Sequence, residues 1–233
     1  MVALPHVHWT DGTRFDLMTI GRSARHAGAV LIVDGSQSVG ALPIDVREIQ
    51  PDVLVCTGYK WLLGPYSTAV AYFGPRYDRG EPIEENWIAR RGSANFQRLV
   101  DYEDEYEPGA IRYDGGERSN FVLLPILIEA LRLILEWTPE GIQQYCRRLV
   151  AGPVERARAL GFVVEAEAWR GAHLFGLRTP PGLDLKRLPQ ALQRQNVCAS
   201  LRGSALRVSP NVYNDQSDLD ALVQALADVV ASA

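Results

Sequence analysis

Two residues able to do chemistry follow apolar stretches of the chain. Asp34 ends the run 29–33, and Lys60 comes shortly after the run 53–56. Continuous apolar runs of this length indicate strands buried on both faces of a parallel sheet. Ligands of open α/β sheets bind beyond the carboxyl ends of the strands. The sequence therefore predicts a carboxylate and an amine at one ligand-binding edge.

These two groups have complementary chemistry. Neighbouring strands lie about 5 Å apart, so the acid and the amine could reach opposite sides of one planar pyridine ring. A carboxylate beside the ring nitrogen favours its protonated form, and a lysine amine can form a Schiff base with an aldehyde. Two simpler interpretations stay open. Asp34 could be a turn residue, and Lys60 could be a solvated surface lysine.

The lengths of the segments between the expected strands predict the relative directions of those strands. Residues 35–52 are numerous enough for a crossover, so the strands before and after them can be parallel. Residues 61–67 are too few for a crossover of about a dozen residues, so the strand 68–73 should run antiparallel. The expected fold is α/β, with a mostly parallel sheet and one antiparallel strand.

The later sequence predicts a second domain. Residues 75–118 look irregular, and their acidic run 101–105 indicates a solvated loop. A helix with an apolar face follows, and then shorter patterns predict a small α+β domain. We therefore expect domains at 1–138 and 139–233. The elements expected after residue 120 are a helix over 124–135, two helices flanking Gly152-Pro153, strands at 162–164, 172–177, 197–201 and 205–209, a helix over 185–193 and a last helix from Asp215.

Three segments that follow one another along the chain are more specific sequence motifs. They are VDGSQSVGA at 33–41, CTGYKWLLGP at 56–65 and RVSPNVYN at 207–214. Together they resemble the class V aminotransferase family, which includes cysteine desulfurases, kynureninases and isopenicillin-N epimerase-like proteins. The resemblance implies a partial fold-type I enzyme that depends on pyridoxal 5'-phosphate (PLP) and forms a homodimer. It also implies transamination, epimerisation or elimination on an amino acid or related amine.

The resemblance assigns roles around the cofactor ring. Lys60 matches the lysine that forms the Schiff base, and Asp34 matches the partner of the pyridinium nitrogen. Gln37 matches a residue that hydrogen-bonds the ring hydroxyl and the Schiff-base side of the cofactor. After the lysine is released by the substrate, its amine would be the natural base for moving the substrate's α-proton.

Other matches concern the phosphate and the substrate. Thr57 and Tyr59 match positions that contact the phosphate, although many members have His at the second, so the longer Tyr59 would shift that contact. Arg207 matches the residue that pairs with the substrate carboxylate; a surface role for it stays open. Arg118 is a better candidate than Glu117 for a partner subunit's phosphate, because a carboxylate would repel that phosphate. A purely structural Arg118 remains equally possible.

The chain also departs from the family pattern. The short stretch between Cys198 and Arg207 leaves no long loop for a mobile thiol, so desulfuration is disfavoured, and Cys198 is expected to be a packed strand residue. The resemblance covers only the later part of a typical member, without the early helix that cradles the phosphate. The alternative hypothesis is therefore a truncated, non-catalytic remnant or assembly partner that keeps the fold but binds PLP weakly.

The composition of the chain bears on its partners, its location and the presence of a metal site or membrane span. The 47% hydrophobic content of the 233 residues allows a sizeable core, and a net charge of −4 makes nucleic acid a poor partner. Three widely spaced cysteines favour a reducing, cytoplasmic location, and no cluster suggests a metal site. No secretory signal is evident, and the longest apolar stretch, 121–137, is interrupted and too short to span a membrane. We expect a small-molecule substrate.

Overall fold

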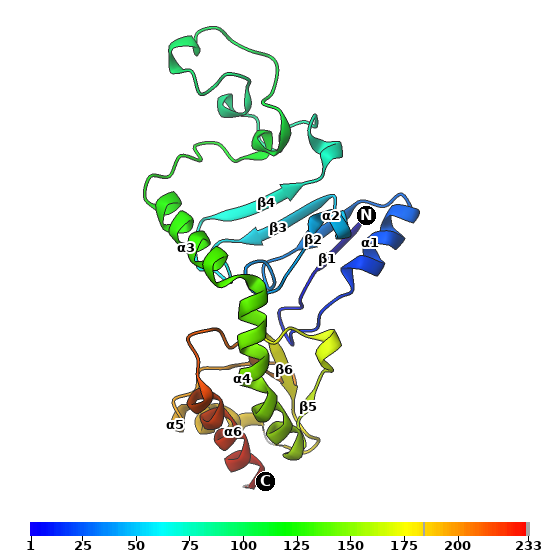
Figure 1. Cartoon of the computed structure of the whole chain (residues 1–233), viewed down its shortest axis with the longest axis vertical. Helices are drawn as coiled ribbons and strands as arrows, with labels where there is room; N and C mark the ends of the chain where they lie inside the picture. Colours follow the sequence, from blue (N-terminus) through cyan, green and yellow to red (C-terminus); the bar gives the residue numbers. More distant parts are fainter. Residues whose placement is uncertain (184, 232–233) are drawn as a thin grey trace. The chain divides into compact units, whose positions relative to one another are not determined.

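The computed structural model describes residues 1–183 and 185–231. The chain divides into two compact units (Figure 1). Unit 1 contains residues 1–4, 17–36 and 45–132, and unit 2 contains residues 5–16, 37–44 and those from 133 onward. The later boundary lies close to the expected one at 138. Two short early segments, however, fold with residues far along the chain.

Unit 1 is built on a four-stranded sheet with the order β1-β2-β3-β4. β2 and β3 are parallel, with Asp34 opposite Val55, and β3 and β4 are antiparallel. The prediction of a mostly parallel sheet with one antiparallel strand is confirmed. The strands are β1 (Val2–Pro5), β2 (Leu31–Asp34), β3 (Val53–Thr57) and β4 (Ala69–Phe73).

The two faces of this sheet differ in burial. Side chains alternate between the faces of a strand, and Leu31, Val33 and Leu54 are buried on one of them. The helix α1 (Leu17–His26) contacts β2. On the other face Asp34 and Val55 are exposed. The proposed acid therefore lies on the more open face of the sheet as far as the structure describes it.

A short helix leads into β3. α2 (Val46–Ile49) begins after Asp45, whose carboxylate accepts a hydrogen bond from the Arg47 amide at 2.8 Å. This is the usual way to satisfy an N–H group that has no partner inside the helix. The crossover from β2 to β3 thus contains only a brief helix.

The region after β4 is irregular, as predicted. Its backbone forms isolated 3-10 turns, and the buried Arg112 ties them together by donating to the carbonyls of Glu107 at 2.8 Å and Gly80 at 2.6 Å. The turns are η1 (Pro75–Tyr77), η2 (Trp87–Ala89), η3 (Phe96–Arg98) and η4 (Gly109–Tyr113).

The apolar helix α3 (Leu123–Trp137) is present where the pattern predicts it. Its expected apolar face is only partly covered. Leu127 and Ile134 are buried, whereas Ile128 is 47% and Leu135 is 75% exposed. Amphipathic spacing thus identifies the helix, but it does not ensure that the described residues cover the whole apolar stripe.

Unit 2 packs helices on an antiparallel sheet with the order β5-β6-β8-β7, which confirms an α+β arrangement. Its core joins side chains of α4, α6 and the strands, including the fully buried Leu206 and Leu226. The strands are β5 (Val163–Val164), β6 (Phe175–Arg178), β7 (Ser200–Arg202) and β8 (Ala205–Val208). The helices are α4 (Pro139–Ala159), α5 (Leu188–Arg194) and α6 (Gln216–Ala231), with 3-10 turns η5 (Glu167–Trp169) and η6 (Leu185–Arg187).

The expected break at Gly152-Pro153 is wrong, because α4 continues through it. Proline removes one helical hydrogen bond and crowds the preceding turn. Here Val150, Pro153, Val154 and Ala157 are all buried. The apolar burial of this face offsets the local cost, so a single helix persists where the local sequence suggests two.

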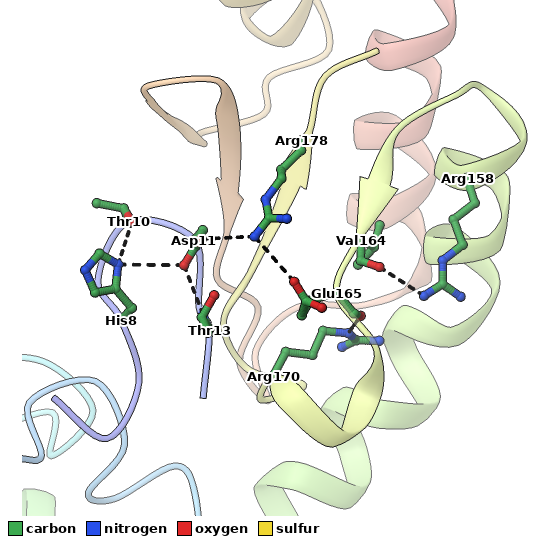
Figure 2. A network of polar contacts seen from close by, with 9 residues as sticks. All are labelled: His8, Thr10, Asp11, Thr13, Arg158, Val164, Glu165, Arg170 and Arg178. Atoms are coloured by element: carbon green, nitrogen blue, oxygen red, sulfur yellow. Dashed lines mark hydrogen bonds and ion pairs between the residues drawn. The ribbon is translucent and has the colours of Figure 1, made fainter. Parts of the chain in front are cut away.

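The early segment 7–14 forms a tight hairpin in unit 2, with a bridge between Val7 and Arg14. Figure 2 shows the polar network at its tip. His8 Nδ1 lies 2.6 Å from the Thr10 hydroxyl, and Arg178 on β6 lies 3.4 Å from the Asp11 carboxylate and 3.3 Å from that of Glu165. The ion pair between Asp11 and Arg178 therefore attaches the hairpin to β6, and Glu165 contacts the same guanidinium.

Gly12 permits the close approach of this hairpin to the sheet. Its φ is +74°, and a Cβ there would lie 2.4 Å from the Leu174 carbonyl oxygen. We predict that Gly12→Ala destabilises the protein by about 3 kcal/mol or more, because the clash is with backbone that cannot rotate away. Chemical denaturation would measure the change.

Gly203→Ala is the matched control for this substitution. Gly203 also has a positive φ, +61°, but a Cβ would meet nothing within 4 Å. Only the conformational penalty of about 1 kcal/mol should remain. Equal losses of stability in the two variants would show that the contact with residue 174 is unimportant.

Two buried histidines make the stability of unit 2 depend on pH. The pKa of His6 and that of His173 are both lowered to about 4, chiefly by burial; for His6 the nearby Arg14 and His173 contribute to the same lowering. An unfolded histidine has a pKa of about 6.5. Between these values the unfolded chain binds protons that the folded chain does not, so the free energy of unfolding must fall as the pH falls from 6.5 to 4.

We predict that His173→Gln reduces the slope of unfolding free energy against pH in this window, as measured by urea unfolding between pH 7.5 and 4.5. The full contribution of one histidine is of the order of 3 kcal/mol. His26→Gln is the control, since His26 is exposed. An unchanged slope in the His173 variant would contradict the prediction.

Candidate functional site

Asp34 ends β2 and is fixed by its own turn. Its Oδ1 accepts a hydrogen bond from the Ser36 amide at 2.8 Å, and the Gly35 amide donates to the Val55 carbonyl at 2.7 Å. The first bond is a common side-chain-to-backbone turn contact, which agrees with the simpler interpretation of Asp34. It also holds a carboxylate at the carboxyl end of the strand, where it remains exposed.

Ser36 connects this turn to the next strand. The Ser36 side chain is buried, and its Oγ accepts a hydrogen bond from the Thr57 amide at 3.2 Å. The turn that follows β2 is therefore joined directly to the last residue of β3. Ser36 was not among the predicted site residues, although it lies inside the motif around Asp34.

Thr57 presents an unsatisfied hydroxyl. Its Oγ1 is buried and has no hydrogen-bond partner among the described residues. A buried polar atom without a partner costs about 1–3 kcal/mol, and a hydroxyl can donate to an anionic oxygen. The residues present at this strand end therefore fit a phosphate-bearing ligand.

The turn that carries Lys60 requires glycine. A Cβ on Gly58 would lie 2.1 Å from the Thr68 hydroxyl oxygen, and the Gly58 amide donates to the Thr68 carbonyl at 2.8 Å. The Gly64 amide returns to the Gly58 carbonyl at 2.8 Å. These bonds close the backbone around Lys60 and present it, half-buried, just beyond β3.

Tyr59 is engaged by a neighbouring aromatic ring. It stacks on Tyr66 with centroids 4.3 Å apart, and Lys60 Nζ lies 5.7 Å from the Tyr59 centroid. Both tyrosines are exposed. The phosphate contact expected for Tyr59 thus remains a prediction, while its observed contact is with another aromatic side chain.

Arg207 lies in unit 2 on β8, opposite Gly176 of β6. One terminal nitrogen donates to the Trp9 carbonyl at 2.9 Å, and its Nε is buried without a partner in the part of the chain that the structure describes. Burial lowers the pKa of Arg207, and the nearby Arg202 lowers it further. A guanidinium with unmet hydrogen-bonding capacity is suited to an anionic ligand.

Arg118 belongs to unit 1, and its side chain contacts residues of its own loop. It forms an ion pair with Asp114 and lies 3.4 Å from the Ile111 carbonyl. Glu117 adopts a positive φ of 53°. The predicted contact of Arg118 with a partner subunit's phosphate would require it to exchange or share these local contacts.

Gln37 is half-buried and belongs to the segment 37–44 of unit 2. Its carbonyl lies 2.8 Å from His173 Nε2. The sequence gives no sign of this contact, since 136 positions separate the two residues. The predicted site residues thus fall into two groups: Asp34, Thr57, Tyr59, Lys60 and Arg118 in unit 1, and Gln37 and Arg207 in unit 2.

Cys198 corrects another expectation. It is exposed and precedes β7, so the prediction of a packed strand residue is wrong. Burial raises the pKa of Cys56 and of Cys146 to about 11, which disfavours their thiolates.

Among the described residues, no group of three or more His, Cys, Asp or Glu side chains could hold a metal ion. No described helix has the length and hydropathy to cross a membrane.

Comparison with known proteins supports the interpretation of these motifs. The family model for aminotransferase class-V matches residues 1–222. An uncharacterized aminotransferase, YcbU, of Bacillus subtilis is 25% identical over 97% of this chain and 59% of its own length. The isopenicillin N epimerase of Streptomyces clavuligerus is 27% identical over 95% of this chain and 58% of its own length.

A solved structure extends the likeness to the fold. The apo cysteine desulfurase of Thermococcus onnurineus NA1 superposes with a TM-score of 0.81 at 20% identity, over 100% of this chain and 60% of the desulfurase. At this identity the likeness concerns the fold alone. The chain spans somewhat less than 60% of the length of YcbU and of the isopenicillin N epimerase.

The match over residues 1–222 covers nearly the whole chain and all three motif segments. The neighbours share its mostly parallel sheet, and the predicted PLP-dependent fold type I is confirmed. This chain therefore belongs to the aminotransferase class-V family, a family of PLP-dependent enzymes.

Proposed function

We propose that this chain carries the cofactor-binding lysine and the ring-nitrogen carboxylate of a PLP-dependent enzyme that acts on an amino acid or related amine. The observation that carries the proposal is the unsatisfied hydroxyl of Thr57 at the sheet edge shared by Asp34 and Lys60. It gives the edge an unused donor for phosphate. Family membership supplies the cofactor that has a phosphate, an aldehyde and a ring nitrogen.

Each residue has a separate part in this proposal. Asp34 would hold a proton at the ring nitrogen, and Lys60 Nζ would bond the aldehyde carbon. Thr57 would donate to the phosphate, with Tyr59 and Arg118 as further candidate contacts. When bound, PLP would withdraw electrons from the substrate's α-carbon.

The substrate side of the proposal rests on other residues. Arg207 would pair with the substrate carboxylate, and Gln37 would bond the ring hydroxyl. Once released, the Lys60 amine would move the α-proton. Transamination, epimerisation and elimination differ in where that proton goes, and each agrees with these roles. We further propose a cytoplasmic homodimer, a location favoured by the three free cysteines.

A second candidate function follows from the extent of the chain. It spans only part of its relatives, and Asp34 and Val55 are exposed on one sheet face. The 233 residues alone could keep the fold and bind PLP weakly, acting as an assembly partner. Equilibrium dialysis separates the two functions, because tight stoichiometric binding supports the enzyme and weak binding supports the assembly partner.

The lysine content of the chain gives a sharp test of Lys60. The sequence contains two lysines, Lys60 and Lys186. We predict that PLP added to the protein gives a visible absorption band, that borohydride fixes the cofactor to the peptide containing Lys60, and that Lys60→Ala abolishes both signals. Lys186→Ala is the matched control and should retain them. Fixation at Lys186 alone would refute the assignment.

Asp34 can be tested without removing its turn. Asn at this position can still accept the Ser36 amide through Oδ1, but it has no negative charge. We predict that Asp34→Asn raises the dissociation constant for PLP by about 10- to 100-fold, the loss expected for a charged hydrogen bond of about 1.5–3 kcal/mol. Asp101→Asn, in an exposed loop, is the control. Equal affinity of the Asp34 variant and the wild type would exclude the proposed role.

A further inference from the structure

A buried polar network in unit 2 ends on the backbone of the segment 37–41. Gln143 and His173 are 5% and 0% exposed. Gln143 Nε2 lies 2.6 Å from the Ala41 carbonyl and 2.8 Å from His173 Nδ1, and its Oε1 accepts the Ala172 amide at 3.0 Å. His173 Nε2 lies 2.8 Å from the Gln37 carbonyl. The network therefore joins α4 and the residues just before β6 to this segment.

The partners determine where the protons lie. A carbonyl oxygen only accepts, so Nε2 of His173 must carry a proton toward Gln37, and the amide nitrogen of Gln143 must face Ala41. That nitrogen has two hydrogens, and the second points to His173 Nδ1, which must then be the acceptor. One tautomer and one amide orientation satisfy these four bonds together. The histidine is therefore neutral, in agreement with the pKa of about 4 that burial gives it.

The same segment is also closed on itself. The Ala41 and Leu42 amides both donate to the Ser38 carbonyl, at 3.0 and 2.7 Å. Ser38 is fully buried, and Gly40 has a φ of +97°. Within the turn, the Ser38 carbonyl accepts both amides. From outside, His173 bonds the Gln37 carbonyl at one end of the turn, and Gln143 bonds the Ala41 carbonyl at the other. Fixing the Gln37 carbonyl restricts the backbone from which the Gln37 side chain projects.

We propose that neutral His173, oriented by Gln143, is a positioning residue for Gln37. This inference rests on the proposed function, in which the Gln37 side chain bonds the cofactor's ring hydroxyl. His173 would not touch the cofactor. It acts through the bond from Nε2 to the Gln37 carbonyl, so removal of that donor should affect Gln37 more than removal of the acceptor at Nδ1.

Two substitutions separate these bonds. In His173→Gln the amide nitrogen can reach the position of Nε2, which keeps the donor to Gln37 and loses the acceptor for Gln143. In His173→Asn the shorter side chain can replace Nδ1 as the acceptor but cannot reach the Gln37 carbonyl. Each variant removes a similar number of buried hydrogen bonds, so a merely structural role predicts similar effects.

Hydrogen exchange of the apo chain is the first readout. We expect the Ala41 and Leu42 amides to exchange at least about tenfold faster in His173→Asn than in His173→Gln, a difference of about 1.4 kcal/mol in local opening. Amides of α6 report global stability and serve as the internal reference. Equal acceleration of the turn in both variants would overturn the proposal.

The cofactor spectrum is the second readout. In protein loaded with PLP, we expect His173→Asn to shift the visible band or its pH dependence, and His173→Gln to stay close to the wild type. Faster exchange in the Asn variant with an unchanged spectrum would overturn positioning of Gln37 toward the cofactor. If wild-type protein shows no band, the proposed function fails, and the exchange comparison still decides whether His173 holds the turn.

The wild-type chain provides a check that does not depend on how the variants fold. Long-range nitrogen–proton correlation spectra distinguish the two neutral tautomers of histidine. The proposal requires a proton on Nε2 and none on Nδ1 of His173 at neutral pH. The opposite tautomer, or a charged ring, would overturn it.

Discussion

The parallel register of β2 and β3 is the constraint on which the candidate site in unit 1 depends. It sets Asp34 opposite Val55, so that both strands end at the same edge of the sheet. Parallel neighbours present their carboxyl ends together, where backbone groups and turn side chains are no longer used by the sheet. A shift of one residue would move Asp34 to the other face. The carboxylate and the lysine turn share an edge because this register holds.

Small residues then determine how the turns meet at that edge. Ser36 joins the turn after β2 to the end of β3 by accepting the Thr57 amide, and Gly58 leaves room for Thr68 beside the turn that carries Lys60. Neither residue would perform chemistry. They fix the backbone from which the side chains of Thr57 and Lys60 project.

Unit 2 stabilises its two early segments in different ways. The hairpin 7–14 is held at the surface by ion pairs around Asp11, and its close approach depends on Gly12. The segment 37–41 is held by the buried amide and imidazole of Gln143 and His173. Surface pairs tolerate substitution because water competes for them. A buried network has one satisfied arrangement, which makes it the better device for fixing the backbone at Gln37.

The sequence by itself determined the strands around Asp34 and Lys60, their relative directions and the family, because apolar run lengths, connection lengths and motif wording are local properties. It failed at Pro153, where burial of α4 outweighs the local cost of proline, and at Cys198, whose strand begins later than its apolar pattern suggests. Only the tertiary structure revealed the contact of His173 with Gln37 and a Thr57 hydroxyl that has no hydrogen-bond partner among the described residues. Both depend on which groups lack or find a partner after distant segments pack, and no spacing along the chain encodes that.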